Sequence, residues 1–152
     1  MNRREFDLTA YCGLYCGDCL RFKFKSADLA QELAKELEKV NFNEYAKIKS
    51  NFVKELEHYN KTRKVLDKIA ELKCNTPCRL GGDGCEQGCE IKTCVESKEL
   101  EGCWQCKEFE ICDKFKILEP YSGDNPRKNV RKIKKYGLGD WVKHREKFYK
   151  YL

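Results

Sequence analysis

The sequence contains little of what common catalytic centres need. It has only two histidines, His58 and His144, in 152 residues, which leaves little material for a Ser-His-Asp or Cys-His centre. A glycine-rich phosphate loop of the nucleotide-binding kinds is missing, and so is a repeat of fixed period. An enzymatic role is therefore uncertain, and the sequence favours a non-catalytic protein.

Long apolar stretches are also missing. No run of about 18 uncharged apolar residues is present to span a bilayer, and residues 1–10 are charged and lack the apolar segment of a signal peptide. Apolar residues make up 41% of the chain and charged residues 37%, a globular composition. We expect no membrane partner and a cytoplasmic location.

Cysteine, by contrast, is abundant. The eleven cysteines are Cys12, Cys16, Cys19, Cys74, Cys78, Cys85, Cys89, Cys94, Cys103, Cys106 and Cys112. An odd number, no secretory signal and a chain long enough to bury a core all argue against a disulfide framework. We predict that all eleven are candidate metal ligands, with a mixture of ligands and buried free thiols as the alternative.

The first cysteine cluster has the spacing Cys12-x3-Cys16-x2-Cys19. Gly13 and Gly17 follow two of these cysteines, and we expect both to adopt the φ angles that a tight turn around a metal needs. Radical S-adenosylmethionine enzymes use the same spacing for a four-iron cluster, but their β/α barrel of about 200 residues does not fit here. Either a later cysteine closes this site, or its metal keeps an open position.

The second set of cysteines lies in residues 74–112. Its most specific unit is Cys103-x2-Cys106, a turn that presents two sulfurs to one tetrahedral ion. Neither ferredoxin spacing is present, so zinc is favoured over an iron–sulfur cluster. We expect two or more zinc ions per chain. The pairing of ligands is open, and His58 and His144 are more typical of ordinary core or surface histidines.

Residues 26–73 contain no cysteine, glycine or proline and have a helical pattern. We expect Ser26 to cap the first helix and residues 41–43 to form a break. Three apolar stripes are expected to be the core faces of packed helices. These stripes are Leu29, Leu33, Leu37 and Val40; then Tyr45, Ile48, Phe52, Leu56 and Tyr59; then Val65, Leu66, Ile69 and Leu72.

Positive charge is concentrated at the carboxyl end. Residues 126–152 carry a net +8, whereas residues 74–112 carry −4. Nucleic acid and the chain's own acidic cysteine lobe are therefore both candidate partners for this tail. We expect a basic helix with Val130, Ile133 and Tyr136 inward, a break at residues 137–139, and a final helix capped by Asp140. That last helix places Trp141, His144, Arg145, Phe148 and Leu152 on one side.

These patterns predict a mainly α fold, in which a helical scaffold carries a loop-rich, cysteine-ligated lobe with zinc-ribbon-like or knuckle-like turns. We expect one domain over residues 1–152. Its sub-regions are an N-terminal cysteine cluster (1–25), a helical insert (26–73), a cysteine-rich metal lobe (74–112) and basic amphipathic C-terminal helices (113–152).

Several runs resemble a known family. They are YCGLYCGDC at residues 11–19, CEIKTC at 89–94, GCWQCKEFEIC at 102–112 and KYGLGDW at 135–141. Together they resemble DUF3795, a prokaryotic, largely archaeal and anaerobe-associated family of uncharacterised cysteine-rich proteins. Residues 26–73 are longer than this family suggests, and Ile111 replaces the usual proline. The resemblance implies metal binding, presumed to be zinc, by the named cysteines, and no established reaction.

The predicted function is therefore a zinc-binding protein with structural thiolate sites, acting as an interaction or adaptor module for an unidentified protein partner. Two alternatives stay open. One is nucleic-acid binding through residues 126–152. The other is an iron–sulfur redox or catalytic centre at Cys12, Cys16 and Cys19.

Overall fold

The computed structural model describes residues 3–82, 84–85 and 88–146. In this part of the chain the fold is mainly helical, as predicted, and the only strand-like pairing is one isolated bridge between Thr9 and Tyr15. The chain forms two compact units, one of residues 1–22 and 75–152 and one of residues 23–74. No helix within the described ranges is both long and apolar enough to cross a bilayer.

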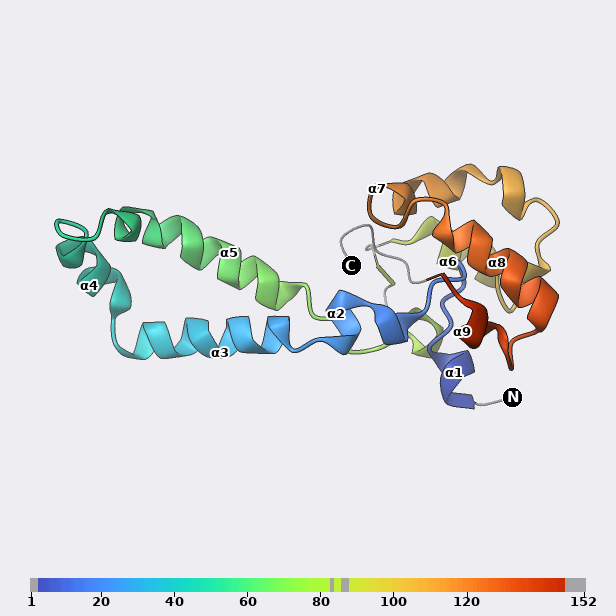
Figure 1. Cartoon of the computed structure of the whole chain (residues 1–152), viewed down its shortest axis with the longest axis horizontal. Coiled ribbons are helices and arrows are strands. Elements are labelled where there is room, and N and C mark those ends of the chain that lie inside the picture. The colour runs from blue at the N-terminus through green and yellow to red at the C-terminus, as the bar shows by residue number, and fades with distance from the viewer. Residues whose placement is uncertain (1–2, 83, 86–87, 147–152) are drawn as a thin grey trace. The chain divides into compact units, whose positions relative to one another are not determined.

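The unit of residues 23–74 is a helical hairpin (Figure 1). Its elements are α3 (Ser26–Lys39), α4 (Phe42–Lys49), the 3-10 helix η2 (Lys54–His58) and α5 (Tyr59–Glu71). Contacts at both ends fix α3 and α5 as antiparallel. Lys73 forms an ion pair with Asp28 at one end, and Arg63 donates a 3.2 Å hydrogen bond to the Ala34 carbonyl at the other.

The predicted break between the first two helices is confirmed. α3 ends at Lys39, and Asn41 has left-handed backbone angles (φ 48°, ψ 46°) immediately before α4. The start of α3 differs by one residue from the prediction, since Ser26 is its first helical residue and Lys25 holds the N-cap position without a side-chain hydrogen bond.

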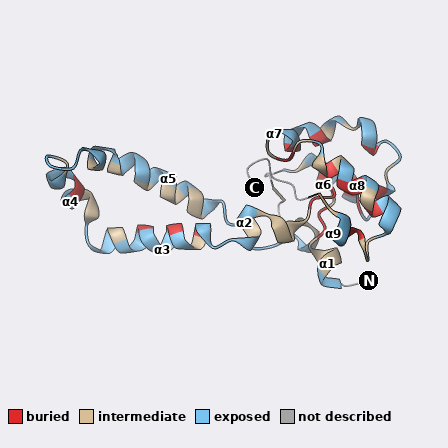
Figure 2. Ribbon diagram, in the orientation of Figure 1, coloured by how far each residue is buried: buried red, intermediate tan, exposed pale blue. Residues whose placement is uncertain are grey.

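The expected core faces of the hairpin are largely wrong, because no member of the three stripes is fully buried; those that are partly buried are Leu37, Leu56, Tyr59, Leu66 and Ile69. The buried residues of α3 are Ala27, Ala30 and Ala34, whereas Leu29 and Leu33 are 59% and 47% exposed. Exposed members of the three stripes are Val40, Tyr45, Ile48, Phe52, Val65 and Leu72. The small alanines let the α3 backbone approach α5 closely, and two helices alone have room for only one buried row. Figure 2 shows the resulting exposure of both long helices.

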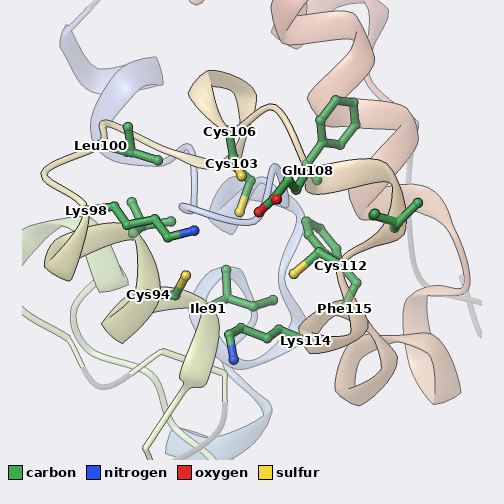
Figure 3. Close-up of a pocket in the computed structure, with 13 residues that line it drawn as sticks. Ile91, Cys94, Lys98, Leu100, Cys103, Cys106, Glu108, Cys112, Lys114 and Phe115 are labelled. Carbon is green, nitrogen blue, oxygen red and sulfur yellow. The ribbon is translucent and has the colours of Figure 1, made fainter.

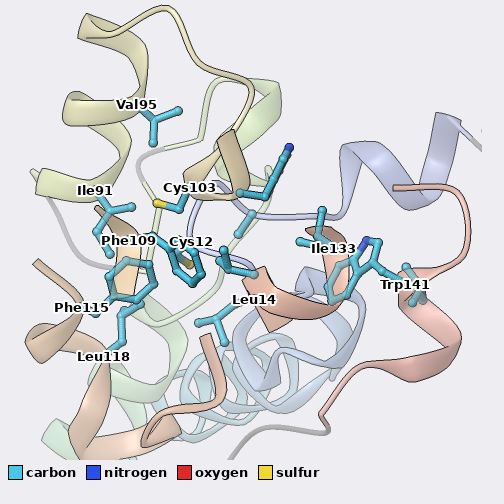
Figure 4. Packing of buried hydrophobic residues seen from close by; sticks show 14 residues of the cluster. Cys12, Leu14, Ile91, Val95, Cys103, Phe109, Phe115, Leu118, Ile133 and Trp141 are labelled. Atoms are coloured by element: carbon cyan, nitrogen blue, oxygen red, sulfur yellow. The ribbon is translucent and has the colours of Figure 1, made fainter. Parts of the chain in front are cut away.

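The other unit is built from short elements. In chain order they are α1 (Arg3–Asp7), η1 (Cys16–Asp18), α2 (Leu20–Lys23, at the unit boundary), η3 (Cys78–Leu80), α6 (Glu90–Ser97), η4 (Cys103–Gln105), η5 (Phe109–Ile111), η6 (Asp113–Leu118), α7 (Glu119–Ser122), α8 (Asn125–Tyr136) and α9 (Trp141–His144). Its core contains Val130 and Ile133 of α8, as predicted, together with Phe115 and Trp141 (Figure 4). Cys12 and Cys103 are buried in the same core.

The C-terminal helices depart from the prediction in three ways. Tyr136 is exposed instead of inward and stacks on His144, with ring centroids 3.8 Å apart. Asp140 holds the N-cap position of α9, but its carboxylate contacts Lys143 and His144 instead of capping. α9 ends at His144, so Arg145 follows the helix; Phe148 and Leu152 lie outside the described residues.

The basic segment packs on the cysteine-rich lobe of its own chain. Arg131 forms a forked pair with Glu110, at 2.7 and 2.5 Å, and Arg127 donates to the Cys112 carbonyl at 2.9 Å. Arg127 also lies over the Phe115 ring, 4.9 Å from its centroid. These contacts engage two of the arginines that a nucleic acid would use.

Candidate metal centre

Four cysteines line one pocket in the cysteine-rich lobe. They come from three segments: Cys94 from α6, Cys103 and Cys106 from the η4 turn, and Cys112 from the end of η5. The pocket has a volume of about 320 Å³. Figure 3 shows the sulfurs of Cys94, Cys103 and Cys112 turned toward its interior.

The Cys103-x2-Cys106 turn has a local cause. The Cys103 N–H donates to the Tyr11 carbonyl at 2.8 Å, and the Cys106 N–H donates back to the Cys103 carbonyl at 3.1 Å, which closes a 3-10 turn. This places two thiols three residues apart beside the same pocket, as the C-x2-C spacing predicts.

The pocket has an apolar wall that disfavours bare thiolates. Ile91, Val95, Phe109 and Phe115 line it together with the cysteines. Burial, together with the neighbouring thiolate charges of Cys112, Cys106 and Cys94, raises the pKa of the Cys103 thiol to about 12. Cys103 is therefore electrostatically coupled to the other three thiols of the pocket.

A second group of cysteines joins the N-terminal cluster to the lobe. Burial, together with the thiolate charges of Cys19, Cys78 and Cys89, raises the pKa of Cys85 to about 12. Cys12 is buried, which raises the pKa of its thiol well above the usual value, and the charges of Cys85 and Cys78 act in the same direction. The first cluster thus lies beside cysteines of the second set, as expected if one of them closes its site.

The described part of the chain contains no preformed metal-binding group. Within residues 3–82, 84–85 and 88–146, no three Cys, His, Asp or Glu side chains lie close enough together to hold a metal ion. All eleven cysteines fall within these ranges, and none of them is in a disulfide bond. Cys16 is the first residue of η1, and Cys74 is the last residue of the hairpin unit. Their predicted roles as metal ligands stay predictions.

The two glycines of the first cluster have different roles. Gly13 has a φ of +84°, and a Cβ there would lie 2.9 Å from both the Pro126 carbonyl oxygen and Val130 Cγ2. The expectation of a special φ is confirmed at this position and wrong at Gly17, which is not in the left-handed region. A Cβ at Gly17 would instead lie 2.4 Å from the Tyr15 ring.

Sequence reasoning missed the role of Arg79. Its guanidinium lies 4.4, 4.6 and 5.2 Å from the ring centroids of Phe6, Tyr11 and Trp104. It donates to the carbonyls of Thr9, at 2.9 Å, and Glu101, at 2.7 Å. Arg79 therefore joins the N-terminal segment to the η4 turn, a relationship that carries no signal in the sequence.

The chain belongs to the family described as protein of unknown function DUF3795, whose family model matches residues 8–117. This range includes all eleven cysteines and ends before the KYGLGDW run at residues 135–141. No curated protein and no solved structure matches the chain.

Proposed function

We propose that this member of the DUF3795 family is a zinc-thiolate protein in which Cys94, Cys103, Cys106 and Cys112 hold one ion. The observation that supports the proposal is the presence of these four thiols around a single pocket, although they come from three separate segments. All four were among the eleven predicted ligands, but spacing had paired only Cys103 with Cys106.

The donor set fits zinc. Four thiolates around one tetrahedral ion are the usual ligands of structural zinc sites, and such an ion contributes to folding and carries out no redox chemistry. The four sulfurs do not form a metal-binding group in the described residues, so holding one ion requires that their side chains move toward one another. The four residues would then join α6, the η4 turn and the end of η5.

We extend the proposal to a second ion at the group formed by Cys19, Cys78, Cys85 and Cys89. Its support is that Arg21, two residues after Cys19, donates a hydrogen bond to the Cys85 carbonyl, and that the charges of Cys19, Cys78 and Cys89 help to raise the pKa of Cys85. Cys12 and Cys16 are the further candidates in that group, and buried free thiols are the alternative role for Cys12. Both ions would act structurally, in an interaction or adaptor module located in the cytoplasm.

The test is the metal content of the protein purified anaerobically without added metal, measured by mass spectrometry together with the visible spectrum. We expect about two zinc ions per chain and no colour. Cys106→Ser should lower the zinc content by about one ion, whereas the control Ile111→Ser, at an exposed position of the same pocket, should retain both.

Other outcomes identify the alternatives. Equal zinc loss in both variants would contradict the assignment of ligands to the pocket. Iron with visible absorbance that is lost in Cys16→Ser would establish instead the iron–sulfur centre predicted for Cys12, Cys16 and Cys19.

A further inference from the structure

We propose that the helical hairpin of residues 23–74 is a homodimerisation module, which pairs with the hairpin of a second copy to form a four-helix bundle. The first observation is an exposed apolar row that follows α3 to its C-cap residue, Val40. Leu29, Leu33 and Val40 are 59%, 47% and 66% exposed. At about 100° per residue they lie within about 40° of one another on the helix, and about 110° from the buried alanine row.

α5 carries a matching row. Val65 is 57% exposed, and Ile69, one turn later, is only partly buried. Arg63, Leu66 and Ala70 form the partly buried side of α5, and Arg63 bonds to α3. Measured from that side, Val65 and Ile69 are displaced in the same rotational sense as the leucine row of α3 is from its alanines. Because the helices are antiparallel, this sense places both rows on the same side of the hairpin.

That shared apolar face needs a cover. The buried residues of α3 are three alanines, and none of the residues of α5, all of which are described, is fully buried. Helices of this length gain most of their stability from packing an amphipathic face. Two such hairpins stacked face to face give a four-helix bundle, in which each row becomes a core row.

Charge complementarity favours a second copy of the hairpin as the partner that covers this apolar face. α3 contains four acidic and two basic residues, whereas α5 contains four basic and two acidic residues. Glu32 lies one residue before Leu33, and Glu36 lies three residues after it. Both are on the edge of the apolar row of α3 that faces away from α5. Lys64 and Lys68 stand at the same offsets from Val65, on the corresponding edge of α5.

Charge also selects the symmetry. A two-fold axis parallel to the helices places α3 of one copy against α5 of the other, so that the acidic edge meets the basic edge. A two-fold axis across the helices would pair α3 with α3 and α5 with α5, bringing like charges together. Glu36 pairs with Lys39 and Lys68 with Glu71 within one chain, but exposed pairs of this kind are weak and exchange readily.

The experiment is sedimentation analysis of the full chain over a range of concentrations, with two double charge reversals. The wild-type protein should be a dimer. Glu32→Lys with Glu36→Lys should raise its dissociation constant by about tenfold or more, and so should Lys64→Glu with Lys68→Glu. Mixing the two variants should restore dimers, because every edge of the mixed pair is then complementary.

The control is Glu55→Lys with Glu57→Lys, which makes the same charge change in η2 and should leave the dimer intact. Circular dichroism of each variant checks that the helices still form. A wild-type chain that is monomeric throughout would overturn the proposal and leave the apolar face to another part of the chain. A dimer that both variants weaken without rescue on mixing would overturn the α3-to-α5 pairing. Neither result depends on metal content, so this proposal and the zinc proposal fail separately.

Discussion

Arg145 donates two hydrogen bonds to the Asp18 carboxylate, of 2.5 and 2.8 Å, although 127 residues separate them in the chain. Both side chains are largely buried, and the guanidinium also lies 4.8 Å from the centroid of the Tyr15 ring. Tyr15 in turn meets Trp141 edge to face. The first cysteine cluster is therefore held by the chain's C-terminal segment, independently of any metal.

Replacing Asp18 with asparagine should destabilise the fold by about 2 kcal/mol, because a partly buried guanidinium loses its charged partner. Denaturant unfolding measures the change. The control is Asp124→Asn, where an exposed carboxylate lies 3.5 Å from Arg127 and Arg131, and about 0.5 kcal/mol is expected. Equal losses in the two variants would mean that the Asp18 pair is no stronger than a surface contact.

Gly13→Ala should be more damaging than Gly81→Ala. Both glycines have positive φ, +84° and +96°, so both substitutions carry a backbone cost of about 1 kcal/mol. Only at Gly13 does the new Cβ meet α8, at 2.9 Å, whereas nothing lies within 4 Å of a Cβ at Gly81. We expect a total of about 3 kcal/mol at Gly13 by thermal or denaturant unfolding. Similar losses at both positions would show that α8 can shift to admit a methyl group.

Arg79→Lys should destabilise the fold by about 2 kcal/mol even though the charge is kept. A lysine cannot donate to the Thr9 and Glu101 carbonyls as a planar fork while also stacking on Tyr11 and Trp104. Unfolding in denaturant measures the loss, and hydrogen exchange should show faster opening of residues 9–11. An unchanged denaturation midpoint would indicate that a positive charge beside the aromatic rings is sufficient and that the planar guanidinium is not required.

Local signals in the sequence predicted the boundaries of the hairpin and of α8. The absence of glycine and proline from residues 26–73 indicated a helical insert, and Pro126 and Gly137 stand at the two ends of α8. These features succeed because the backbone preferences of proline and glycine depend on neighbours in sequence.

Two features depended on partners far away in the chain, and the sequence did not reveal them. α3 has two apolar rows side by side, and the alanine row is buried because α5 approaches it, so the leucine pattern pointed to the wrong row. Likewise, the lining of the pocket by Cys94 and Cys112 depends on how α6 and η5 pack, which spacing does not encode.

Zinc binding at the four-cysteine pocket should strengthen steeply as the pH rises. Because burial and the neighbouring thiolates raise the pKa of Cys103 to about 12, its thiol is protonated at neutral pH, and an ion must displace the proton to bind. The logarithm of the affinity should therefore rise with pH with a slope that approaches the number of protons released, about four for a complete site. Competition with a chromophoric chelator at several pH values measures this slope, and Cys106→Ser should lower it by about one. An affinity that does not change with pH would mean that the pocket thiols are not the ligands.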